Sequence, residues 1–127
     1  MTPTALLTLL LFQACHWAAD FTHLSTPWML QAKSKGTPLF PIAVHAAVHG
    51  GMMALVTLLL YEPASALWVL ALEWGSHFLI DVGKGRLQAA FPTLANPNNP
   101  YHWWIFGLDQ WLHQAVIVGL VYHLAAA

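Results

Sequence analysis

The stretch PASALWVLALEWGSHFLIDVGK, residues 63–84, decides how this chain is expected to fold. It begins with proline, which suits the first turn of a helix, and its ionisable side chains are Glu73, His77, Asp81 and Lys84. The first three are spaced four residues apart and therefore share one face of a helix. Because about 20 helical residues cross the hydrocarbon core of a membrane, the stretch predicts a membrane-spanning helix with one polar face.

Three further stretches have the same character, and each carries two ionisable side chains one helical turn apart. The pairs are His16 with Asp20, His45 with His49, and Asp109 with His113. We therefore expect an all-α fold, a polytopic membrane protein whose residues 1–127 form a single four-transmembrane-helix bundle. The expected spans are residues 3–24, 41–61, 63–84 and 101–123. The second and third are joined so tightly that they should form an antiparallel hairpin.

The composition also indicates a membrane protein. Of the 127 residues, 58% are hydrophobic and 7% are charged, whereas soluble domains have roughly 25% charged residues. The formal net charge of −1 and the four basic residues give no surface for a nucleic acid, so no nucleic-acid partner is expected. One cysteine excludes an internal disulfide. No lysine or arginine precedes the first apolar stretch, so a cleaved signal peptide is not expected.

The basic residues predict an orientation. Lys33 and Lys35 lie between the first and second spans, and Lys84 and Arg86 lie after the third. Connections rich in lysine and arginine stay in the cytoplasm. We therefore expect both of these connections to be cytoplasmic and both termini to lie on the opposite side of the membrane.

The four polar pairs also share a depth in the membrane. Counted from the cytoplasmic ends at about 1.5 Å per residue, they lie about 5 to 18 Å deep. A single pair would indicate a salt bridge or a polar contact between helices. Four pairs in one layer favour a metal centre, with a structural or proton-relaying polar core as the alternative. The predicted metal ligands are His16, Asp20, His45, His49, His77, Asp81, Asp109 and His113.

The donor types narrow the choice of metal. Imidazoles and carboxylates without a thiolate suit zinc, iron or manganese. A zinc ion needs only three or four protein ligands, so this many candidates predict one or two Zn or Fe ions, with surplus carboxylates orienting the imidazoles. Glu73 is the candidate catalytic residue, and both a ligand and a general base for metal-bound water are open to it. Lys84 is suited either to an anionic head group or to snorkelling toward the membrane interface.

Four motifs resemble those of the small bacterial membrane proteins grouped as domain of unknown function 3307. They are H-x-x-x-D-F at 16–21, the histidine pair at 45–49, HFLIDVGK at 77–84 and FGLDQWLH at 106–113. The resemblance covers essentially the whole chain. It implies a helical protein of the bacterial inner membrane, which makes the expected location of both termini periplasmic. It implies no established activity.

The leading functional hypothesis is a metal-dependent hydrolase of a lipid-like or membrane-associated substrate, because a metal lowers the pKa of its bound water to about 7. A di-iron lipid hydroxylase or desaturase-like enzyme uses the same ligand types. Metal-ion transport or sensing is a third hypothesis, although transport sites usually lie near the midplane. A small accessory subunit of a larger membrane complex is the fourth, and a homo-oligomer is equally open.

Overall fold

The computed structural model describes residues 1–127 as five α-helices and one short 3₁₀ helix, so the prediction of an all-α chain is confirmed. The long helices are α1 (Pro3–Phe21), α3 (Leu39–Leu60), α4 (Pro63–Ala90) and α5 (Pro100–Ala126). The short ones are α2 (Pro27–Lys35) and η1 (Pro92–Ala95). The helices differ from the expected spans at two ends, since α1 ends at Phe21 and α4 continues past Lys84 to Ala90.

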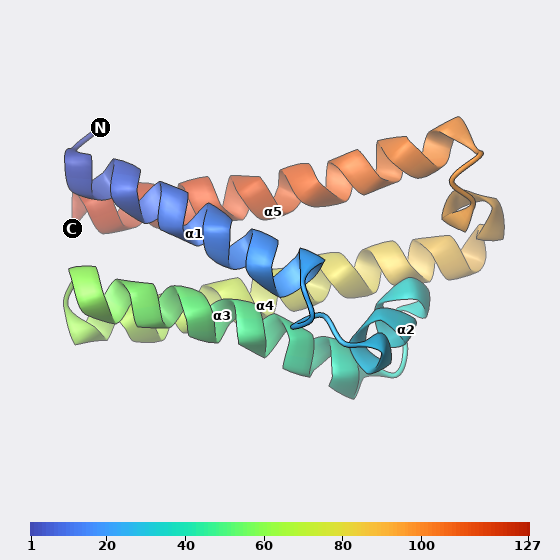
Figure 1. Ribbon diagram of the computed structural model, residues 1–127, viewed down its shortest axis with the longest axis horizontal. Coiled ribbons are helices and arrows are strands. Elements are labelled where there is room, and N and C mark those ends of the chain that lie inside the picture. The colour runs from blue at the N-terminus through green and yellow to red at the C-terminus, as the bar shows by residue number, and fades with distance from the viewer.

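The four long helices pack as a bundle. α1 contacts α3 and α5, and α4 contacts the same two helices. α3 and α4 form the expected antiparallel hairpin, since only Tyr61 and Glu62 separate them. Figure 1 shows both termini and the α3–α4 turn at one end of the bundle, with α2 and η1 at the other. The helix α2, which carries Lys33 and Lys35, and the C-terminal end of α4, which carries Lys84 and Arg86, therefore lie toward the same end of the molecule.

The helix starts follow from local hydrogen bonding. Thr2 and Thr26 accept bonds from backbone N–H groups of the first turns of α1 and α2, and Asn99 does the same for α5. Each of these helices has proline in its first turn, where the missing N–H costs nothing. The cap at Thr26 begins a helix that the sequence analysis assigned only to a connection.

Two glycines let α2 dock on α4. Gly36 ends α2 in the left-handed region, at φ 69°, where glycine is favoured. A Cβ atom placed on Gly85 of α4 would lie 2.3 Å from both the Gly36 nitrogen and the Lys33 carbonyl oxygen. Only glycine fits this approach of the two backbones. The contact brings the Lys33 side chain against the bundle interior.

The bundle buries many polar side chains and exposes many large apolar ones. Its buried residues include five histidines, His16, His45, His49, His77 and His113, together with Glu73, Asp81 and Asp109. Leucine and tryptophan lie outside, and Leu67, Leu79 and Trp104 are each about 70% exposed. An apolar cluster around Phe12, Met53, Val69 and Ile117 fills the remaining core.

Two of the long helices are long and apolar enough by themselves to cross a membrane. These are α1 and α3, with mean hydropathies of 1.2 and 1.8. α4 and α5 do not reach that apolarity, because their inward polar side chains count against the mean. The expectation of four spans is thus supported by apolarity for two helices.

Candidate metal centre

Six of the eight predicted metal ligands converge at one level of the bundle. They come from all four long helices: Asp20 from α1, His45 and His49 from α3, His77 and Asp81 from α4, and His113 from α5. The side chains are at most 5% exposed. The one-turn spacing within each pair is what turns both members of the α3 and α4 pairs inward.

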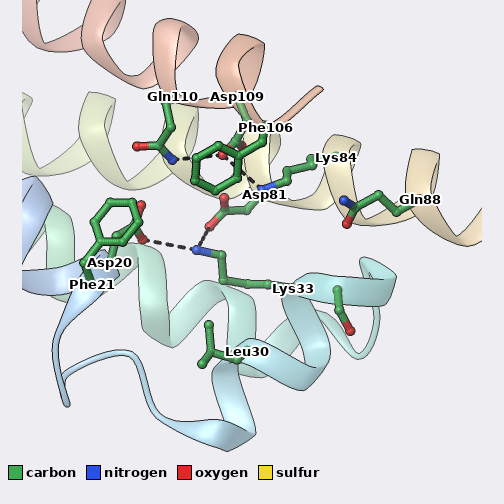
Figure 2. A pocket seen from close by; sticks show the side chains of 11 residues that line it. Asp20, Phe21, Leu30, Lys33, Asp81, Lys84, Gln88, Phe106, Asp109 and Gln110 are labelled. Carbon is green, nitrogen blue, oxygen red and sulfur yellow. Dashed lines mark hydrogen bonds and ion pairs between the residues drawn. The ribbon is translucent and has the colours of Figure 1, made fainter. Parts of the chain in front are cut away.

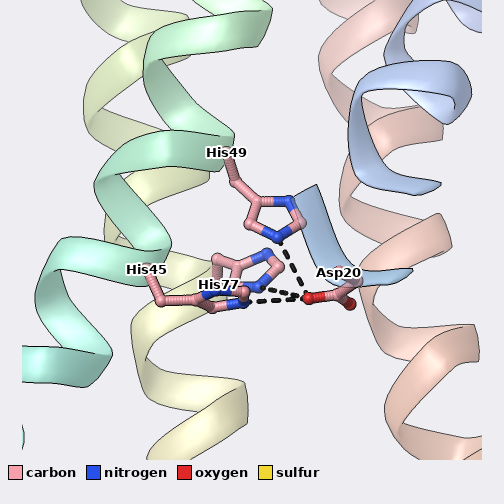
Figure 3. A group of neighbouring side chains, drawn as sticks. All are labelled: Asp20, His45, His49 and His77. Carbon is pink, nitrogen blue, oxygen red and sulfur yellow. Dashed lines mark hydrogen bonds and ion pairs between the residues drawn. The ribbon is translucent and has the colours of Figure 1, made fainter. Parts of the chain in front are cut away.

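The first group of donors surrounds the Asp20 carboxylate (Figure 3). Its ligand atoms, from Asp20, His45, His49 and His77, all lie within 4.8 Å of one another. Oδ1 of Asp20 is 2.9 Å from Nε2 of His45 and 3.1 Å from Nε2 of His49. Four ligands bound at the usual zinc distances stand about 3.4 Å apart in a tetrahedron. The group therefore has donor types and spacings that could hold a metal ion.

A second group adjoins the first and consists of His77, Asp81 and His113, again within 4.8 Å. Oδ2 of Asp81 is 3.3 Å from Nε2 of His77, and Oδ1 is 3.7 Å from Nε2 of His113. The two oxygens of one carboxylate thus face histidines of different helices. Because His77 has a single Nε2 to offer, it could serve only one ion, and a second ion would have to be held by the other donors of its group.

Partners on the far side of two imidazole rings orient them toward the centre. Nδ1 of His113 donates to the backbone carbonyl oxygen of Asp109 at 2.7 Å, which leaves the lone pair of that ring on Nε2. Nδ1 of His77 is 3.2 Å from Oε1 of Glu73. Nε2 of both histidines is buried without a hydrogen bond. Buried polar atoms normally have partners, and imidazole nitrogens of this kind are the donors that a metal ion would use.

Lys33 contacts the donor groups directly. From the sequence it was expected only to mark the cytoplasmic side of the membrane. Its ammonium nitrogen is 3.1 Å from Oδ1 of Asp20, 3.3 Å from Oδ2 of Asp81 and 3.0 Å from Nε2 of His45. Burial by itself would lower the pKa of Lys33, but the attraction of Asp81 and Asp20 outweighs it and raises the pKa. Thr26 and Gly36 are helix-start and helix-end signals from which α2 itself could have been predicted. They do not indicate where the Lys33 side chain lies.

Three predicted residues flank the two donor groups. Nε2 of His16 is 3.1 Å from Oε1 of Gln110 and 3.4 Å from Oδ2 of Asp20. Oδ2 of Asp109 pairs with Nζ of Lys84 at 3.2 Å. Glu73 lies behind His77, as described above. Ligation by His16 and Asp109, and a catalytic role for Glu73, stay predictions.

Comparison with known protein families assigns the chain to one of them. Residues 6–127 match the family described as "Protein of unknown function (DUF3307)". The chain belongs to this family. Among curated proteins and solved structures, no match was found. The resemblance inferred from the four motifs is thereby confirmed, and the function of this DUF3307 protein has to be argued from its site.

A pocket of about 230 Å³ lies directly beside the donor groups of this DUF3307 protein. Its polar lining includes Asp20, Lys33, Asp81, Lys84, Asp109 and Gln110. Figure 2 shows Lys33 reaching toward both Asp20 and Asp81, with Lys84 opposite. Asp20 and Asp81 thus belong both to the donor groups and to the pocket wall.

Proposed function

We propose that this protein is an integral membrane enzyme with an intramembrane metal centre and that it hydrolyses a membrane-associated substrate. One observation carries the proposal: donors from four helices converge next to a pocket that shares Asp20 and Asp81 with them. A bound zinc or iron ion supplies a water of lowered pKa and polarises the bond to be cleaved. A purely structural polar core would not require a pocket at the ligands.

The proposal includes four membrane-spanning helices. α4 and α5 are less apolar than α1 and α3, but the polar side chains that make them so, such as Glu73 and Asp109, are buried. Their outward residues are apolar, and Trp104 and Trp111 of α5 are 70% and 65% exposed. Polar groups inside and apolar groups outside are the arrangement that lipid favours.

The positive-inside rule then predicts the orientation in a bacterial inner membrane. In a Cys15→Ala background, a cysteine added after Ala127 is expected to react with a membrane-impermeant maleimide in intact cells. A cysteine at Ser34, next to Lys33 and Lys35, is expected to react only after the cells are opened. The cysteine-free chain controls for background labelling. Reversed labelling would place the candidate centre near the opposite leaflet.

Glu73 is the residue whose role the site geometry helps to define. Its contact with Nδ1 of His77 favours orientation of that histidine over a role as general base for metal-bound water. Substitutions of such outer carboxylates typically lower metal affinity 10- to 100-fold. We expect Glu73→Gln to weaken zinc binding by about tenfold, as measured by competition with a chromogenic chelator. Unchanged affinity with lost turnover would instead support a general base.

The hydrolytic proposal is tested with the purified protein in detergent and a bacterial lipid extract. Mass spectrometry is expected to detect hydrolysis products with the zinc-loaded wild type and none with an Asp81→Asn variant. Lys35→Gln, an exposed change, serves as the control. Stoichiometric zinc without any zinc-dependent product would count against a hydrolase. Bound iron with products that require dioxygen would identify the oxidative alternative.

A further inference from the structure

The pocket beside the donor groups carries a charge balance that depends on metal. Three carboxylates line it, those of Asp20, Asp81 and Asp109, against the ammonium groups of Lys33 and Lys84. The sum is one negative charge. Each divalent ion held by the donor groups adds two positive charges, which makes the pocket a site for an anion. Lys33 and Lys84 come from different helices, α2 and α4, and both line this pocket.

A second cavity continues from the first between α4 and α5. It has a volume of about 220 Å³ and is lined mainly by leucine and isoleucine, among them Leu79, Leu87, Leu108 and Leu112. Leu79 and Leu108 are 69% and 50% exposed on the outer face of the bundle. Lys84 and Asp109 belong to the walls of both cavities. A polar pocket and an apolar groove thus meet at one ion pair.

Lys84 is placed to serve both cavities. Its nitrogen is 3.2 Å from Oδ2 of Asp109 and 5.1 Å from the centre of the Phe106 ring, and its side chain is 21% exposed. This position at the mouth of the groove differs from simple snorkelling, in which the ammonium group would leave the bundle for the interface. Lysine side chains commonly bind phosphate groups, and they do so through the point charge of the ammonium group.

We propose that the substrate is a phosphate-bearing amphiphile. Its anionic head occupies the pocket between the metal centre, Lys33 and Lys84, and its apolar chain lies in the groove between α4 and α5. A phosphate group has several acceptor oxygens, enough to face a metal ion and two ammonium groups at once. This inference rests on the proposed metal centre and names the class of molecule that the centre acts on.

Dodecylphosphonate tests the proposal because it has the expected head and chain and no bond to hydrolyse. Titration calorimetry with the zinc-loaded protein in detergent is expected to show binding at least tenfold tighter than for methylphosphonate or dodecanol. Removal of zinc should weaken dodecylphosphonate binding about tenfold, because the pocket then returns to a net negative charge.

Two variants separate the head site from the chain site. Lys84→Gln should weaken the binding of dodecylphosphonate and of methylphosphonate alike, by about tenfold, with Lys35→Gln as the matched control.

Gly83 lines the groove, and a Cβ placed on it meets no atom within 4 Å, so Gly83→Phe fills the groove without a backbone clash. It should weaken dodecylphosphonate about tenfold and leave methylphosphonate unchanged. Gly51→Phe, at another exposed and open helical glycine, is the control.

The outcomes distinguish failure of the phosphate-bearing substrate from failure of the proposed metal centre. If zinc binds and dodecylphosphonate binds no more tightly than dodecanol, the phosphate head is wrong while the metal centre stands. If methylphosphonate binds equally well, or if Gly83→Phe has no effect, the groove does not hold the chain and the proposal is overturned. If the protein takes up no metal, the metal centre itself fails.

Discussion

Replacement of His77 by alanine is expected to abolish stoichiometric zinc binding. His77 belongs to both donor groups, and its Nε2 lies 4.0 Å from Oδ1 of Asp20 and 3.3 Å from Oδ2 of Asp81. Loss of this nitrogen removes one donor from each group, so no intact set of four remains. The loss of affinity should exceed the 10- to 100-fold that outer-shell changes cost, that is, be more than about 100-fold.

The measurement is the metal content of protein purified in detergent, followed by chelator competition. Wild type is expected to hold one or two ions per chain, and His77→Ala none after dialysis. His123→Ala is the matched control, because His123 is an exposed histidine near the C-terminal end of α5, outside the donor groups. Equal zinc content in wild type and His77→Ala would refute the assignment. A wild-type protein that takes up no metal would leave a structural polar core or a proton pathway.

The inward turn of the polar pairs could be predicted because it depends on local spacing alone. His45 and His49 face the same side of any regular helix, wherever that helix packs. The short gap at Glu62 likewise permits little except an antiparallel hairpin. For these reasons the sequence indicated the bundle, the layer of polar residues and most of the donor set before any tertiary contact was known.

Lys33 could not be placed in the same way. It is 13 residues from Asp20, and its contact with that carboxylate depends on how α2 docks against Gly85. A lysine in a connection between spans is usually a marker of orientation, and that interpretation hid the inward contact. Local helix signals predict α2 itself but not the face of the bundle on which it lies.

Residue spacing alone also could not predict which of the aspartates would join the donor groups. Asp81 and Asp109 are both one turn from an inward histidine, yet Asp81 faces the donor groups while Asp109 pairs with Lys84. The rotation of α5 relative to α4 decides between these outcomes. Packing angles between helices scatter by about 15 to 20°, so the sequence does not fix that rotation.

Lys33→Met is expected to have opposite effects on the protein with and without metal. The Lys33 ammonium group contacts the same Asp20 and Asp81 oxygens that a divalent ion would bind. Without metal, its removal breaks the buried ion pairs with Asp20 and Asp81 and leaves these carboxylates with their histidine contacts alone. This loss should lower the free energy of unfolding by about 3 kcal/mol. With zinc present, a competing cation has been removed, so zinc affinity should rise about tenfold.

Thermal unfolding in detergent, with and without zinc, measures both effects on one sample. The zinc-free Lys33→Met protein should unfold at a lower temperature than wild type, and zinc should stabilise it by more than it stabilises wild type. Lys35→Met, a change at an exposed lysine of the same helix, should alter neither value. Weaker zinc binding by Lys33→Met would show that the lysine supports the metal rather than competing with it. Such competition would have a functional consequence, because a metal ion bound by Asp20 and Asp81 would free the Lys33 ammonium to face an anion in the adjoining pocket.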